Sequence, residues 1–104
     1  MLKIARPPRP PYYAVIAPSV LAADTKGYPE LGAGLIALAR EVDGFYGIDV
    51  CLQSGFSLAV SYWRSLEAIE TWRRHAQHLR AKELGRTRWF DSYVTRIARV
   101  EHEY

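Results

Sequence analysis

The chain has 104 residues, of which 49% are hydrophobic and 24% charged, with a formal net charge of +3. This length allows one domain with one core, and the composition is that of a folded protein, which excludes intrinsic disorder and a second domain. The basic residues of the second half are interleaved with acidic ones, which favours a solvated helix face over a nucleic-acid-binding track. No apolar run approaches the roughly 20 residues of a membrane span, and prolines interrupt the N-terminal segment where a signal peptide needs an apolar helix. We therefore expect a cytoplasmic protein.

Cys51 is the single cysteine, so the chain cannot form an internal disulfide. Its neighbours Val50 and Leu52 are apolar, which predicts a buried thiol. A lone reduced cysteine also fits a reducing compartment.

The chain divides into a proline-rich N-terminal arm, residues 1–11, and a single domain, residues 12–104. Prolines in the arm cannot donate hydrogen bonds to a sheet, so we expect it to be extended. Tyr12–Val20 is β-branched and aromatic and predicts a first strand. Within it, Pro18 favours an edge position or a bulge near the end of the strand.

The middle of the chain predicts a helix followed by a hairpin. Leucines recur at the helical period from Tyr28 to Val42, and Asp43-Gly44 ends this helix. Phe45–Gln53 predicts a second strand, and the short link Ser54-Gly55 predicts a hairpin turn into a third strand, Phe56–Arg64.

The last third predicts a second helix and a final strand. Ser65 is a suitable N-cap for a helix that runs to about Glu83, either as one helix or as two short ones. Ser92–Tyr104 predicts a long fourth strand. The resulting order of strand, helix, strand, strand, helix, strand predicts an α+β ferredoxin-like fold, with a four-stranded antiparallel sheet and both helices on one face.

The alternation of side chains along the strands suggests how the protein assembles. One face of the third strand carries Phe56, Leu58, Val60 and Tyr62, and its apolar content assigns it to the helices. The opposite face, with Phe45, Cys51, Ala59 and Trp63, would then expose an apolar patch in a monomer. We therefore predict a homodimer through this sheet face.

Several segments together resemble the antibiotic biosynthesis monooxygenase domain family, a group of dimeric α+β barrels. They are SYWRSLEAIETW, His78, GRTRWF and the C-terminal RVEHEY, and the resemblance extends from about Tyr12 to Tyr104. It is strongest to small, uncharacterised bacterial members. It implies a homodimer and, by analogy with one branch, a cofactor-independent monooxygenase that oxidises an aromatic or quinol-type small molecule between the helices and the sheet.

A second branch of the superfamily degrades haem with a Trp on the second helix, an Asn on the first strand and a His further along the second helix. Trp72 matches that Trp in its setting. The chain has no asparagine, however, and Lys82 stands where the haem-ligating His would fall. The resemblance therefore implies no cofactor, and haem is the disfavoured option. Known members of the monooxygenase branch also use an asparagine, which this chain does not supply.

Five residues are candidates for the site. Trp72 lies on the sheet-facing side of the second helix, as a core residue, a pocket wall or both. His75 lies at the edge of that side and His78 outside it, and each is a candidate catalytic acid or base because histidine titrates near neutral pH. Trp63 is an anchor of the predicted dimer interface or a substrate contact, and Tyr93 offers a hydroxyl to a ligand. No metal site is predicted, because the histidines lack a matching Cys or carboxylate.

The main functional hypothesis is cofactor-free oxygenation, with Trp72 shaping the cavity and His75 or His78 handling a proton. The alternative is a non-catalytic dimer that binds a small molecule or haem. A third interpretation is an interaction module defined by its dimer, which would lack a cavity beside Trp72.

Overall fold

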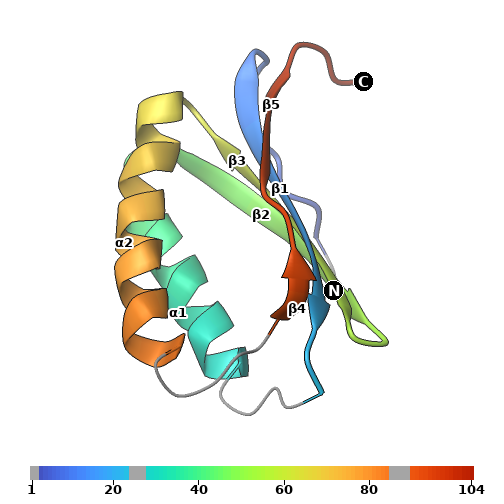
Figure 1. Ribbon diagram of the computed structural model, residues 1–104. Helices are drawn as coiled ribbons and strands as arrows, with labels where there is room; N and C mark the ends of the chain where they lie inside the picture. The colour runs from blue at the N-terminus through green and yellow to red at the C-terminus, as the bar shows by residue number, and fades with distance from the viewer. Residues whose placement is uncertain (1–2, 24–27, 85–89) are drawn as a thin grey trace.

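The computed structural model describes residues 3–23, 28–84 and 90–104, apart from the side chains of 28–31 and 79–84. Both helices cover one side of an antiparallel sheet (Figure 1). The elements are β1 Tyr12–Leu21, α1 Tyr28–Glu41, β2 Phe45–Gln53, β3 Phe56–Trp63, α2 Leu66–Leu84, β4 Phe90–Tyr93 and β5 Arg96–Val100. The predicted α+β ferredoxin-like fold is confirmed, and the second helix is one continuous helix.

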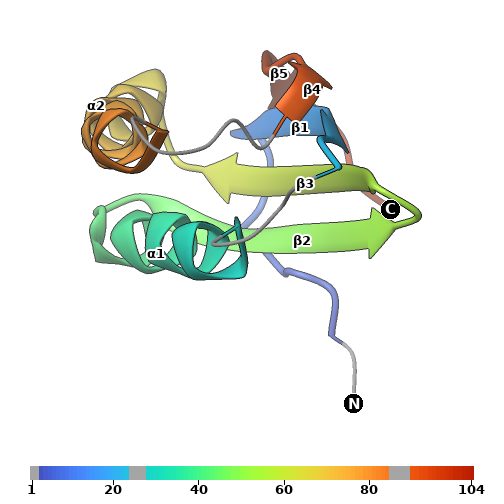
Figure 2. The same cartoon turned by 60° about the horizontal axis from the view of Figure 1, so that its bottom comes forward.

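The sheet has the order β2-β3-β1-β4, and β5 pairs with β1 beside β4. Figure 2 shows β1 between β3 and the two last strands, so the expected edge position of Pro18 is wrong. The other expectation, an irregularity near the end of β1, is confirmed by a register shift between Val20 and Leu21.

The predicted long strand Ser92–Tyr104 is wrong, because it is divided into β4 and β5 and ends at Val100. Both pieces keep one register against β1, with Ile16 opposite Arg96 and Ser19 opposite Tyr93. The gap lies opposite Pro18, whose carbonyl accepts a hydrogen bond from the backbone N–H of Val94 at 3.2 Å. Proline has no N–H to return that bond, so the ladder breaks there.

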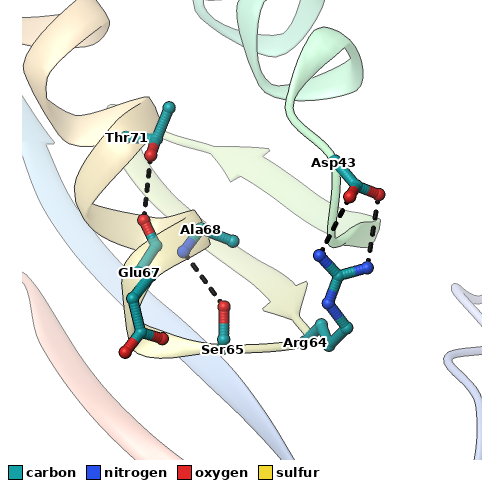
Figure 3. Close-up of polar contacts among 6 residues, drawn as sticks. All are labelled: Asp43, Arg64, Ser65, Glu67, Ala68 and Thr71. Atoms are coloured by element: carbon teal, nitrogen blue, oxygen red, sulfur yellow. Dashed lines mark hydrogen bonds and ion pairs between the residues drawn. The ribbon is translucent and has the colours of Figure 1, made fainter.

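The start of α2 is held by local polar contacts (Figure 3). The Ser65 hydroxyl accepts a hydrogen bond from the backbone N–H of Ala68 at 3.1 Å, as expected of an N-cap. Arg64 donates to both carboxylate oxygens of Asp43, at 3.2 and 3.0 Å. These hydrogen bonds and the Arg64 charge lower the pKa of Asp43. The pair is exposed and so contributes little stability, but it joins the α1–β2 and β3–α2 connections.

The assignment of sheet faces from apolar content is wrong for β3 and for Phe45, although Cys51 does lie on the helix-free face as predicted. Trp63 is fully buried under the helices, with its ring 5.0 Å from Phe45 and 5.7 Å from Trp72. The helix-covered face of β3 therefore carries Trp63 and its alternating neighbours Ser57, Ala59 and Ser61. Phe45 joins this face because a register shift between Phe45 and Gly47 re-phases β2, so that Phe45 lies opposite Trp63.

The helix-free face carries a tyrosine and carboxylate network. Tyr62 donates to Asp49 Oδ2 at 2.8 Å, and the backbone N–H of Ala5 in the N-terminal arm donates to Asp49 Oδ1 at 2.8 Å. Tyr12 donates to Glu103 at 2.8 Å, and its ring meets that of Tyr62 edge-on at 5.9 Å. Burial, followed by the hydrogen bond and charge of Asp49, raises the pKa of Tyr62 to about 12.

Cys51 lies in β2 opposite Leu58 and is exposed, so the predicted burial of its thiol is wrong for the single chain. Within the described residues, no helix is long and apolar enough to cross a membrane.

Candidate functional site

A cavity of about 320 Å³ lies between α1 and the helix-covered face of the sheet. Its floor comes from alternate residues of β1, β2 and β3, and its roof from the sheet-facing side of α1. Trp72 of α2 closes one end, and residues at the end of β4 border the other. The volume is within the range of small-molecule sites, and an interaction module without a ligand would not need it.

The closed end of the cavity is aromatic. Phe45, Trp63 and Trp72 all line it, and the ring of Trp63 contacts the rings of the other two. Trp72 Nε1 donates to the carbonyl of Leu35 in α1 at 3.0 Å, and Trp63 Nε1 donates to Ser61 Oγ at 2.9 Å. Because both indole N–H groups are satisfied, these side chains offer a ligand their ring surfaces. Trp72 is thus both a core residue and a cavity wall.

The open end is marked by rising exposure. Val50 and Leu52 of β2 are each 55% exposed, and Tyr93 of β4 is 66% exposed. All three line the cavity. Tyr93 therefore lies at the rim, where its ring contacts Phe90 at 5.7 Å. The exposure of these residues identifies this end as the mouth of the cavity among the described residues.

The described lining is uncharged. It contains no Asp, Glu, Lys, Arg or His side chain, and its polar groups are hydroxyls: Ser19, Ser57, Ser61, Tyr93 and Thr95. An isolated charge would be costly in such surroundings. The lining therefore favours a neutral, largely apolar ligand.

The structure does not bring the two candidate histidines to this cavity. His75 and His78 are both exposed on α2, and neither is among the described lining residues. His75 borders a separate surface depression with Glu41, Asp43 and Thr71. Of the five candidates, Trp63, Trp72 and Tyr93 therefore share one cavity, while the histidines lie elsewhere.

The described lining offers no histidine to ligate a haem iron. Elsewhere in the described part of the chain, no three His, Cys, Asp or Glu side chains gather closely enough to hold a metal ion. The side chain of Lys82, the residue at the haem-ligand position of the resembling branch, lies outside the described residues.

Sequence reasoning missed the serines of the cavity floor. Ser57 and Ser61 are 5% and 8% exposed, and Ser19 lies opposite Ser57 in the register of β1 and β3. The signal was the alternation of Ser57, Ala59, Ser61 and Trp63, which groups small polar residues with a large aromatic one. That face was assigned to the dimer interface, so its serines were not considered as site residues.

Comparison with known proteins places this arrangement in a family. The model of the family described as antibiotic biosynthesis monooxygenase matches residues 11–84. The chain belongs to the antibiotic biosynthesis monooxygenase family. The chain is also similar to the uncharacterized protein YqjZ of Bacillus subtilis. The two are 41% identical over 101 residues, which cover 96% of this chain and 89% of YqjZ.

Solved structures share the fold at low sequence identity. Rv0793 from Mycobacterium tuberculosis superposes with a TM-score of 0.70 at 23% identity, over 88% of this chain and 97% of that protein. SnoaB, a cofactor-independent oxygenase from Streptomyces nogalater, superposes with a TM-score of 0.68 at 12% identity, over 90% of this chain and 97% of SnoaB. These similarities show that the family's fold is present in this chain.

Proposed function

We propose that this protein is a cofactor-independent monooxygenase that acts on an aromatic or quinol-type small molecule held between the helices and the sheet. The observation that carries the proposal is the uncharged cavity of about 320 Å³ with an aromatic closed end. Family membership supports it, as does the structural likeness to SnoaB, which is described as a cofactor-independent oxygenase.

The chemistry needs little from the protein because the deprotonated substrate is itself the electron donor. With anthrone as the example, the substrate loses a proton from its methylene carbon, and the carbanion gives an electron to O₂. The two radicals combine to a peroxide, which takes up the proton and loses water to leave a carbonyl group. One oxygen atom thus enters the product and the other leaves as water. The cavity excludes bulk water and orients the rings.

This proposal needs no histidine in the site. The described lining offers hydroxyl groups and no stronger base, so the substrate must be acidic enough to give its proton to solvent at the open end. Quinols and anthrone-like compounds meet that requirement. Substrates without an acidic O–H or C–H should not react.

Oxygen uptake tests the proposal. With anthrone or a quinol, the protein should consume O₂ faster than buffer, and Trp72→Ala should lower kcat/KM by roughly tenfold through lost ring contact. Trp72→Phe keeps a ring and should retain more activity. His75→Ala and His78→Ala are matched surface controls and should be active. If the protein consumes no more O₂ than buffer with any such substrate, the proposal is refuted. If the histidine variants lose activity, those histidines take part in catalysis.

We also propose a homodimer formed through the helix-free face, which carries Phe56 and Leu58 in place of the expected Ala59 and Trp63. Phe56, Leu58 and Val20 on this face are 48%, 38% and 41% exposed, an apolar surface that a second sheet would cover. The exposed thiol of Cys51 lies beside Leu58 and would be covered with it.

Sedimentation at micromolar concentration tests the assembly. Leu58→Arg places a charge on the helix-free face and should give a monomer. Val50→Arg is a matched control, because Val50 is in the neighbouring strand but lies at the cavity mouth on the other face. A wild-type monomer, or equal effects of the two changes, would count against the proposed interface.

A second candidate function is a non-catalytic binder of apolar small molecules. The observation that favours it is the lack of an ionisable acid or base, other than the Tyr93 phenol, in the described lining. This reading predicts that anthrone-like compounds bind under nitrogen and are not consumed in air. Its haem-binding form is not supported, because the described lining holds no histidine.

A further inference from the structure

Ser57 carries a buried hydroxyl that has no hydrogen-bond partner among the described residues. It is 5% exposed, and its side chain forms no hydrogen bond with any described residue. Its neighbour along the same face, Ser61, accepts a hydrogen bond from Trp63 Nε1 at 2.9 Å. Buried hydroxyl groups are normally hydrogen-bonded, and leaving one unsatisfied costs about 1–3 kcal/mol. Ser57 therefore needs an explanation that Ser61 does not.

The position of Ser57 supplies one, because its side chain is part of the cavity floor. It lies opposite Ser19 of β1 and Leu52 of β2 in the sheet register, and Ser19 also lines the cavity. Directly opposed residues of antiparallel strands have Cβ atoms about 5 Å apart. The floor thus presents two neighbouring hydroxyl-bearing residues, Ser19 and Ser57, and Tyr93 of β4, opposite Ser19, also lines this end of the cavity.

The two ends of the cavity differ in chemistry. From Ser57 to Ser61, beside the aromatic end, is about 13 Å along an extended strand. A ligand that spans this length meets ring surfaces at Trp63 and Trp72 and a hydroxyl donor at Ser57. The charge-free lining excludes an ionised carboxylate or ammonium group as the polar end.

We propose that Ser57 is the polar anchor of the cavity and donates a hydrogen bond to a carbonyl or phenolic oxygen of a neutral aromatic ligand, with Ser19 beside it. The inference rests on the proposed function in that it takes the cavity to be the ligand site. It adds the residue that would contact the oxygen substituent of such a ligand. If that oxygen gains negative charge during oxidation, the same hydroxyl stabilises it.

Paired probes test the anchor. Anthrone and dihydroanthracene share three rings, and only anthrone has a carbonyl group. Titrated under nitrogen and followed by tryptophan fluorescence, wild-type protein should bind anthrone roughly 3- to 10-fold more tightly than dihydroanthracene. Ser57→Ala should lose this preference by weakening anthrone binding alone. Ser57→Thr keeps the hydroxyl and should keep the preference, and Ser92→Ala, an exposed serine outside the described lining, should change neither affinity.

The melting temperature of the unliganded variants separates an anchor from a structural serine. An anchor without an internal partner predicts that Ser57→Ala melts no lower than wild type, whereas a serine that stabilises the fold predicts a lower melting temperature. A preference that survives in Ser57→Ala, a destabilised Ser57→Ala protein, or the absence of binding by both probes overturns the inference. Oxygen uptake tests the proposed function separately from the anchor. If Ser57→Ala loses the preference for anthrone but the wild type consumes no O₂, Ser57 is the anchor and the protein is not an oxygenase. If the wild type consumes O₂ and Ser57→Ala keeps the preference, the protein is an oxygenase and Ser57 is not the anchor.

Discussion

The two faces of the sheet use their apolar residues in opposite ways. The helix-covered face joins large aromatics, Trp63 and Phe45, to small residues such as Ser57 and Ala59, and the helices over it leave a cavity. The helix-free face presents a more evenly apolar surface, with Phe56 and Leu58 in the same strand, and its Tyr62 hydroxyl is already paired with Asp49. The less apolar face thus holds the core.

The physical reason for this difference is packing. A large side chain beside small ones leaves space that neither helix fills, and that space can be used by a ligand. A strand face without small residues leaves no such space, and it suits packing against another sheet. The comparison predicts that stability of the single chain depends on the helix-covered face far more than on the helix-free face.

The largest expected effect is that of Trp63→Ala. Trp63 is fully buried and contacts Phe45 and Trp72, so its removal should lower the free energy of unfolding by about 3–5 kcal/mol. Leu58→Ala on the helix-free face should cost less than about 1 kcal/mol, since Leu58 is partly exposed. Urea denaturation at concentrations where sedimentation shows a monomer measures both. Equal losses of unfolding free energy in the two variants would show that the two faces of the sheet contribute equally to the stability of the single chain.

A smaller effect is expected at Gly44, whose carbonyl accepts a hydrogen bond from the backbone N–H of Arg64 and so joins the two helix connections. Its φ is +103°, and an added Cβ would lie 3.0 Å from the Cβ of Ala68 in α2. Gly44→Ala should therefore cost about 1–3 kcal/mol. The control is Gly32→Ala in α1, where an added Cβ meets nothing within 4 Å and the helix should gain roughly 0.5–1 kcal/mol. Thermal melts that rank the two variants in the reverse order would contradict this account.

The smallest effect concerns pH and the helix-free face. The pKa of Tyr62 is raised to about 12 by burial and by Asp49, so the folded state holds the phenol proton more tightly than the unfolded state does. This contribution to stability is complete below about pH 10 and is lost as the pH rises through about 12. Tyr62→Phe should remove that alkaline decline in unfolding free energy.

The matched control for this pH dependence is Tyr104→Phe, at an exposed position near the C-terminus. Asp49→Asn removes the charge that holds the proton and should lower the pH at which the Tyr62 phenolate absorbs. Identical alkaline titrations of wild type and Asp49→Asn would show that Asp49 does not act on Tyr62.

Most elements could be predicted from sequence, because their signals are local. Phe45–Gln53 was predicted with the bounds that the structure shows, and Ser65 caps α2 as expected. The last strand was predicted poorly because its break is set by its neighbour: Pro18, far away in the chain, cannot donate to the strand beside it. Because Pro18 belongs to β1, the residues of 90–100 give no sequence signal of the break that its missing N–H causes between β4 and β5.

The candidate site was predicted in part. Trp63, Trp72 and Tyr93 do share a cavity, but Trp63 was assigned to the wrong face, and the histidines were chosen for their chemistry rather than for a known position. The serine floor escaped notice because serine carries no distinctive pattern. Its importance appears only when the burial of Ser57 is seen together with the absence of a hydrogen-bond partner among the described residues.

The sequence by itself determined the order of the elements, their approximate bounds and the family, since periodicity, turn residues and motifs are properties of neighbouring residues. Only the tertiary structure decided which side of the sheet the helices cover. Alternation divides a strand into two faces but does not say which is inward, and one extra residue in β2 moves Phe45 from one face to the other. The cavity follows from that choice, and so does the position of Ser57, which has no hydrogen-bond partner among the described residues, because both lie where the two helices cover the small residues of β3.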